Sequence, residues 1–413
     1  MKKTMRHLLT TDNGRAVLWA LSVSALMLVS CRKHHVEDDV DIPIGLSSSI
    51  ASMNTTGNTR AGVIENLEQF ETQGSFGVFG YKSASNALSI FNNAQVTWNS
   101  TAWQYNPIRF WDTSASHYYF GAYAPRVSSE SGSGSGIYVS YVDNSVATFT
   151  IHHIPNWQLA RYGTVTEANS VKDYAQTTGP GSDLMVAMSH DTPANYLTAT
   201  STHNAGYVDL TFSHILAQLT INVVSISSED MHCFVDGITL GSATSGKQVP
   251  VATEKTSYTL PFQNQSYSSV ADYVTADARY SKEAASPLTG TVDIYPQGGT
   301  FEVLNTPSSA AVEQVYELCS YLMAPFTVTG GLVLKVNYHV NNGASESTNE
   351  IAMQVKTADG PPAVYENLTT IEAGKKYTAT IKFDKQGMVV NKLEVEVANW
   401  GSGGTTNTSY YNW

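Results

Sequence analysis

The histidines and aspartates of this sequence lack the spacing that catalysis or metal binding needs. His152 and His153 are adjacent, and adjacent residues of a strand point to opposite faces, so a surface loop is a simpler interpretation than a metal site. His214 lies in an apolar strand pattern, which favours a core or interface histidine. Asp183 and Asp209 have no acidic partner at the spacing of a glycosidase pair. With no GxSxG, HExxH, P-loop or Rossmann fingerprint, the sequence predicts no catalytic residue, no metal site and no cofactor.

Cys31 is the residue whose setting does predict chemistry. Basic residues precede an apolar run over 16–29, which is shorter than the roughly 20 residues of a membrane span. A basic start, a short apolar run and a small residue before the cut are the parts of a secretory signal. Residues 28–31, Leu-Val-Ser-Cys, resemble the bacterial lipobox. That resemblance implies cleavage between Ser30 and Cys31 and a lipid on the Cys31 thiol; the alternative is an ordinary signal with a stray cysteine.

Composition limits the partners. The formal charge of the whole chain is -12, and the chain without its basic leader carries about -15. Because such a negative surface repels phosphate backbones, we predict no nucleic-acid partner. Charged residues make up 14%, whereas an average globular protein has about 25%. Ser, Thr, Asn, Gly and Tyr replace them, a balance that suits an extracellular β protein.

Two cysteines follow Cys31, and the sequence contains no CxxC pair. Cys233 and Cys319 could form one disulfide or remain two buried thiols, and we favour thiols. The roughly 380 residues that follow the leader are too many for one small core and indicate about two domains.

Short strand patterns bounded by turn-forming residues recur along the chain, and we find no long stretch with helical period. This pattern predicts an all-β fold of antiparallel sandwiches. We expect loops over 128–136 and 193–205, and a domain boundary near Ala205. The expected strands lie at 76–81, 116–123, 208–212, 216–223, 291–295, 332–338, 377–383 and 393–397.

Several segments together resemble the fimbrillin family, the lipoprotein pilins of Bacteroidia. They are the aromatic segments 103–111 and 117–125, the segments 183–187 and 210–219, and the closing strand 395–400. The resemblance implies two transthyretin-like antiparallel β-sandwich domains after a lipoprotein signal peptide. The corresponding ranges are 1–30 for the signal, 31–60 for a tether and candidate propeptide with the first strand, 61–205 for the N-terminal domain and 206–413 for the C-terminal domain.

The resemblance also implies a mode of assembly. Precursors reach the outer membrane as lipoproteins, and an Arg-specific or trypsin-like protease cuts in the first loop. The cut releases the lipid and the first strand, and a C-terminal strand of another subunit fills the opened groove. Expected partners are therefore other pilin subunits, in a homo- or hetero-polymer, the outer membrane before processing, and a host or bacterial surface receptor. Expected locations are the surface of the outer membrane and, after processing, the fimbrium.

The leading segment contains residues that fit this scheme. Residues 40–46 place apolar side chains at every second position, so Ile42, Ile44 and Leu46 could plug a groove, although Pro43 limits the segment to an edge strand. Arg60 is the only charged residue between positions 46 and 64, so we predict cleavage between Arg60 and Ala61. The alternative is a solvated arginine in a linker.

The C-terminus is the expected source of the donor strand. Leu393, Val395 and Val397 alternate well, and a Gly/Ser hinge separates them from a polar tail in which Tyr411 and Trp413 could fill pockets. That tail could equally be a frayed end. It is less apolar than a strong donor strand should be, which leaves stalk, tip and lipid-retaining anchor positions open.

Aromatic residues between positions 98 and 123 support a second hypothesis. If exposed, they could stack on sugar rings, as in a surface glycan-binding lipoprotein; if buried, they fill a sandwich core, which we favour. The residues concerned are Trp98, Trp103, Tyr105, Trp111, Tyr118 and Tyr123.

Overall fold

The computed structural model describes a defined part of the 413-residue chain. The lipidation and signal-cleavage residues, Arg60, Ala61, Tyr411 and Trp413 lie outside the described residues. So do His153 and the stretch 128–136 that we expect to be a loop. The described ranges are 41–50, 67–82, 87–127, 139–142, 148–152, 160–167, 170–176, 183–224, 233–244, 248–250, 257–261, 280–281, 289–295, 301–303, 315–340, 347–358, 363–383 and 392–399.

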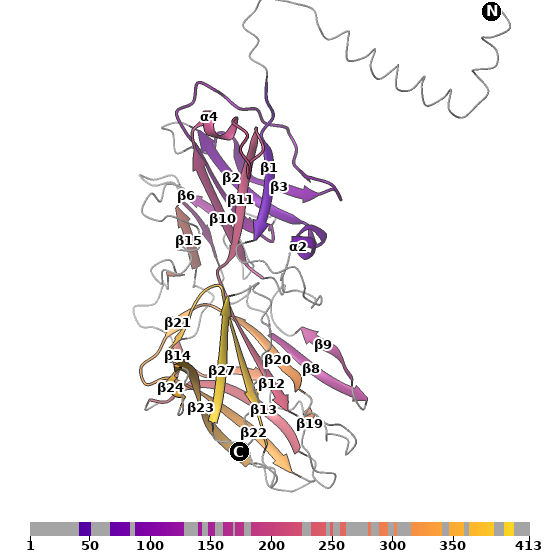
Figure 1. Ribbon diagram of the computed structural model, residues 1–413, viewed down its shortest axis with the longest axis vertical. Helices are drawn as coiled ribbons and strands as arrows, with labels where there is room; N and C mark the ends of the chain where they lie inside the picture. The colour runs from indigo at the N-terminus through magenta and orange to yellow at the C-terminus, as the bar shows by residue number, and fades with distance from the viewer. Residues whose placement is uncertain are drawn as a thin grey trace, which may run out of the picture. The chain divides into compact units, whose positions relative to one another are not determined.

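Most of the described residues lie in strands and very few in helices, which confirms the predicted all-β class (Figure 1). A seven-stranded sheet contains the segments with the most aromatic residues. Two adjacent strands inside this sheet, β5 (Tyr118–Ala124) and β2 (Ser75–Lys82), are buried nearly from end to end, because they have neighbours on both edges and carry apolar side chains on both faces. Its order is β1 (Gly45–Ile50), β11 (Tyr207–His214), β10 (Met185–Asp191), β5 (Tyr118–Ala124), β2 (Ser75–Lys82), β3 (Phe91–Trp98) and β4 (Trp103–Gln104).

A twelve-stranded sheet contains most of the remaining strands. Two of its strands lie off the main path: β19 (Phe301–Val303) pairs with β13 (Cys233–Ser242), and β24 (Val364–Asn367) pairs with β23 (Ser347–Ala358). Its core includes Leu219, Ile221, Leu334 and Ile351, all without solvent exposure. The path runs β18 (Val292–Tyr295), β13 (Cys233–Ser242), β22 (Leu332–Val340), β23 (Ser347–Ala358), β27 (Lys392–Asn399), β26 (Lys375–Ile381), β12 (Ala217–Val224), β20 (Val315–Met323), β8 (Ala160–Glu167) and β9 (Ser170–Gln176).

Three small sheets complete the described strands. They are β14 (Val249–Pro250) with β17 (Thr289–Gly290), β21 (Phe326–Thr327) with β25 (Thr370–Ile371), and a four-stranded sheet. The four-stranded sheet has the order β16 (Tyr280–Ser281), β15 (Ser257–Pro261), β7 (Thr148–Ile151) and β6 (Val139–Val142).

Each strand expected from the sequence overlaps an observed strand, but the pairing is not purely antiparallel. Three of the strand pairs in the described ranges are parallel: β1 with β11, β12 with β26, and β23 with β27. A parallel pair needs a long connection between its strands. All three pairs join segments distant in sequence, whereas alternation within one segment carries no information about the direction of a distant partner.

The change from one large sheet to the other does not coincide with the predicted boundary at residue 205. Strand β11 begins at Tyr207 and still belongs to the seven-stranded sheet, while β8 and β9 come earlier in the chain and join the twelve-stranded sheet. Strand β11 ends at His214 and strand β12 begins at Ala217. Along the sequence, the change from the seven-stranded to the twelve-stranded sheet therefore falls between these two residues. The division into two folding units at residue 205 stays a prediction.

Two short helices occur among the described residues, α2 (Leu67–Gln73) and α4 (Pro193–Tyr196). The second lies where we expected only loop. It starts there because Pro193 occupies the first turn, where no backbone N–H is needed, and the Thr192 side chain accepts a hydrogen bond from Asn195 N at 3.3 Å.

The buried histidine and the cysteines follow the simpler interpretations. His214 is 3% exposed, and its Nδ1 lies 2.8 Å from Oδ1 of the buried Asp183, as expected for a core histidine. Cys233 and Cys319 are buried and form no disulfide, so the thiols that we favoured are the state observed. Burial raises the pKa of the Cys319 thiol, which keeps it protonated and unreactive.

Candidate functional site

Strand β1 forms one edge of the seven-stranded sheet. It runs parallel to β11, with Gly45 opposite Tyr207 and Ile50 opposite Phe212 (Figure 1). About 160 residues separate the partners in sequence. The first described strand of the chain therefore covers the edge of a strand from the middle of the chain.

Apolar side chains on one face of β1 and of the residue directly before it are deeply buried. Ile44 is 2% exposed, Leu46 3% and Ile50 5%, whereas Ile42 is partly exposed. Burying a large aliphatic side chain contributes roughly 1.5–3 kcal/mol, so these three side chains are the main attachment of β1 to its sheet. Ser48 also points to this face, where its Oγ accepts a hydrogen bond from Trp103 Nε1 at 2.7 Å.

The observed strand begins later than the predicted segment 40–46. Pro43 makes only an isolated bridge with Phe110, because proline has no backbone N–H to continue a ladder. Regular pairing starts at Gly45, so of the predicted plug residues Leu46 lies in the strand, Ile44 directly precedes it and Ile42 lies outside it.

Two loops hold the start of β1. Ile44 N donates to Arg109 O at 2.8 Å, and Tyr105 Oη donates to Ile44 O at 2.6 Å. Gly45 N donates to Gly206 O at 2.8 Å. The same carbonyl accepts from Trp111 Nε1 at 3.0 Å, so a buried indole fixes the backbone group that holds β1.

Gly45 lies under an aromatic ring, where only a glycine fits without a shift. A Cβ on Gly45 would lie 2.7 Å from Tyr207 Cδ1 and 2.8 Å from Tyr207 Cγ, closer than such atoms approach. Tyr207 is 40% exposed, so its ring lies between Gly45 and solvent.

We predict that Gly45→Val loosens the start of β1. The added side chain must displace the Tyr207 ring, and such overpacking costs about 1 kcal/mol or more. Digestion of the intact chain with subtilisin should cut within residues 44–50 several-fold faster than in the wild type. The double variant Gly45→Val, Tyr207→Ala should recover most of the resistance, whereas a loss equal to that of the single variant would show that the ring is not the cause.

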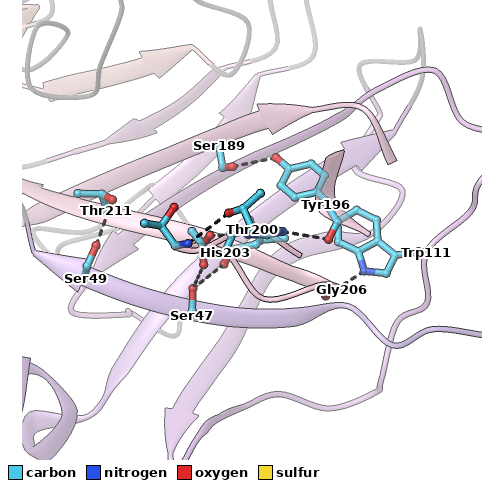
Figure 2. Close-up of polar contacts among 12 residues, drawn as sticks. Ser47, Ser49, Trp111, Ser189, Tyr196, Thr200, His203, Gly206 and Thr211 are labelled. Atoms are coloured by element: carbon cyan, nitrogen blue, oxygen red, sulfur yellow. Dashed lines mark hydrogen bonds and ion pairs between the residues drawn. The ribbon is translucent and has the colours of Figure 1, made fainter. Parts of the chain in front are cut away.

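The outer face of β1 is joined to β11 and to the loop before it by polar contacts (Figure 2). Ser47 Oγ donates to the Asp209 carboxylate, and Ser49 Oγ lies 3.1 Å from Thr211 Oγ1. The other Asp209 oxygen lies 2.5 Å from His203 Nδ1, and His203 Nε2 lies 3.0 Å from Tyr196 O. The Asp209 and Tyr196 bonds raise the pKa of His203.

Aromatic side chains pack beneath this edge. Phe212 of β11 is fully buried, with its ring centroid 4.9 Å from that of Phe70 and 5.2 Å from that of Phe76. Trp103, Trp111, Tyr118 and Tyr123 are also buried, while Trp98 and Tyr105 are partly exposed. Four of the six candidate sugar-stacking residues are thus core residues, as we favoured.

The expected C-terminal donor residues lie in a strand that already has two neighbours. Strand β27 pairs with β26 on one side and β23 on the other. Leu393 and Val395 are buried in the core, and Val397 is 42% exposed. In the described chain these residues therefore act as an internal strand of their own sheet.

Sequence patterns did not point to His203, Gly206 or Trp111 as parts of this site. His203 and Gly206 lie in a loop without periodicity, and an indole that bonds a distant carbonyl leaves no local signal. Only Asp209 had a local sequence signal. It occupies a polar position of an alternating strand, and this pattern predicts a side chain that points outward.

Within the described ranges, no three His, Cys, Asp or Glu side chains are grouped as a metal site would require. Nor does any helix there have the length and apolar character to cross a membrane.

Comparison with known proteins decides the family. The model of the fimbrillin-like family matches residues 59–400, more than three quarters of the sequence. The chain belongs to the fimbrillin-like family. The resemblance seen in the sequence is therefore confirmed.

Several solved structures resemble this fimbrillin-like chain. A fimbrial protein from Bacteroides vulgatus is 20% identical with a TM-score of 0.41, covering 87% of this chain and 99% of that one. The tip fimbrial protein Mfa3 from Porphyromonas gingivalis is 11% identical with a TM-score of 0.30, covering 79% and 94%. The fimbrial anchor protein Mfa2 from the same organism is 8% identical with a TM-score of 0.26, covering 87% and 98%. No curated protein matches the sequence.

Proposed function

We propose that this chain is a pilus subunit, exported as a lipoprotein through Cys31 and assembled at the cell surface by strand exchange. In this role β1 is a removable cover on the edge of β11. Its removal would leave the backbone groups of β11 unpaired along one edge and expose the apolar surface now under Leu46 and Ile50. A strand from another subunit would take the place of β1.

The observation that carries this proposal is the position of β1. It is an edge strand from the start of the chain, it is held by three buried aliphatic side chains, and it precedes the single arginine of the following segment. Cleavage between Arg60 and Ala61 would leave β1 bound only by non-covalent contacts. A strand in the interior of the sheet could not be exchanged without breaking two ladders.

For the donor we propose the tail that follows β27, with Tyr411 and Trp413 as the side chains that fill pockets. Strand β27 itself is paired on both sides, so moving Leu393, Val395 and Val397 into a neighbour would open the twelve-stranded sheet. The proposal assigns the chain a structural and adhesive role without catalysis, with other pilin subunits as partners and a surface receptor if the subunit lies at the tip.

Limited trypsin digestion of the chain that begins at Cys31 tests this function. We expect a new N-terminus at Ala61, followed by concentration-dependent fibres in electron micrographs. The variant Arg60→Ala should stay uncut at this position and monomeric. Fibres from Arg60→Ala, or a cut wild type that stays monomeric at high concentration, would refute the role of β1 as a removable cover.

Protein purified from cells separates a polymerising subunit from an anchor. N-terminal sequencing that starts at Ala61 supports the processed subunit. A blocked, lipid-bearing Cys31 supports instead an anchor that keeps its lipid.

A further inference from the structure

His203 is held between two oxygen acceptors. Its Nδ1 lies 2.5 Å from Asp209 Oδ2. Its Nε2 lies 3.0 Å from the carbonyl oxygen of Tyr196 (Figure 2). Neither oxygen carries a hydrogen when Asp209 is ionised, and a neutral imidazole has only one N–H. Both contacts are hydrogen bonds at the same time only when the ring is protonated.

The protonated ring is connected to β1 by two routes. Through Asp209 it shares a carboxylate with Ser47, whose hydroxyl donates to the other oxygen. Through the backbone it stabilises the loop that ends at Gly206, and Gly206 O accepts the hydrogen bond of Gly45 N. Loss of one His203 contact therefore weakens two attachments of β1: the hydrogen bond of the Ser47 side chain and the backbone hydrogen bond at Gly45.

We propose that His203 is a proton-dependent latch on β1, which holds the covering strand in place when protonated and loosens it when neutral. The inference rests on the proposed function, because it assigns a control to the strand that is exchanged. It makes the exchange of β1 depend on pH: release of β1 becomes easier as the surroundings change from mildly acidic to alkaline.

The charged groups around His203 fix the sign of the effect. Asp209 on β11 and the Tyr196 carbonyl raise the pKa of His203, and Asp191 at the end of β10 acts in the same direction. Stabilisation of β1 is therefore complete below the ordinary histidine pKa of about 6.5 and is lost as pH rises through the higher pKa of the folded state. Protons reach the ring, because His203 lines an open pocket of about 420 Å³ with Asp191 and Asn195.

Hydrogen–deuterium exchange of the intact, uncleaved chain tests the latch without relying on cleavage or assembly. After correction for the intrinsic effect of pH, protection of residues 45–50 should fall about tenfold between pH 6 and pH 8.5, the scale of one charge-assisted hydrogen bond. His203→Gln should give low protection at both pH values. His117→Gln, which removes the exposed histidine directly before β5 of the same sheet, should behave like the wild type.

Unchanged wild-type protection across this range would overturn the latch, and so would a pH effect that persists in full in His203→Gln. If that variant does not fold, the wild-type profile and the titration of the His203 ring followed by NMR decide the question: the two midpoints must coincide. The two proposals can fail separately. If trypsin-cut protein forms no fibres but the hydrogen–deuterium exchange shows the expected pH effect, strand exchange is rejected and the pH-sensitive contact is retained.

Discussion

Leu46→Asp is expected to detach β1 from β11 while the rest of the chain stays folded. Leu46 is 3% exposed, and its replacement places a carboxylate without a built partner in an apolar contact. Such burial costs several kcal/mol, comparable with all that the short edge strand gains from its buried side chains. The strand should leave the edge, because solvation of the whole segment is less costly than burial of the charge.

Exchange mass spectrometry should find residues 45–50 unprotected in Leu46→Asp, with the strands of the twelve-stranded sheet unchanged. Under the proposed function, the same variant should assemble without trypsin, because the edge of β11 is open before any cut. Ser49→Asp provides the control: it adds the same charge to the same strand, but on the exposed face. Equal protection in the two variants would mean that burial does not hold β1.

Phe212→Ala is expected to destabilise the seven-stranded sheet by about 3–5 kcal/mol, the usual cost of removing a fully buried phenylalanine. The Phe212 ring contacts Phe70 of α2 and Phe76 of β2, so its loss leaves a cavity bordered by rigid rings. These neighbours cannot collapse into the space without disturbing the strands that carry them. The effect should reach β1, because Ile50 lies opposite Phe212 in the ladder.

Urea unfolding followed by tryptophan fluorescence measures this loss, since Trp103 packs against Phe70 and Phe76 in the same cluster. Thr211→Ala is the matched control. It changes the residue directly before Phe212 on β11. The Thr211 side chain is on the exposed face, so its loss should shift the free energy of unfolding by less than about 0.5 kcal/mol. A small effect of Phe212→Ala would indicate that this cluster does not stabilise the edge on which exchange depends.

The sequence by itself determined the class of fold and the position of most strands. Alternation of side chains is a local property, so segments such as 332–338 and 377–383 indicate strands without knowledge of their partners. It also indicated that Ile44 and Leu46 lie on one face, that His214 belongs to a core or an interface, and that the chain resembles the fimbrillin family.

Only the tertiary structure decided what each strand pairs with. The contacts of β1 with β11, of Ser47 with Asp209 and of Gly45 with Gly206 join segments about 160 residues apart. Such pairings are decided by the buried area and the hydrogen bonds of the whole folded chain. No single segment contains that information. For the same reason the latch at His203 became visible only in the fold: a histidine in a loop acquires its role from the two acceptors that other strands and turns bring to its ring.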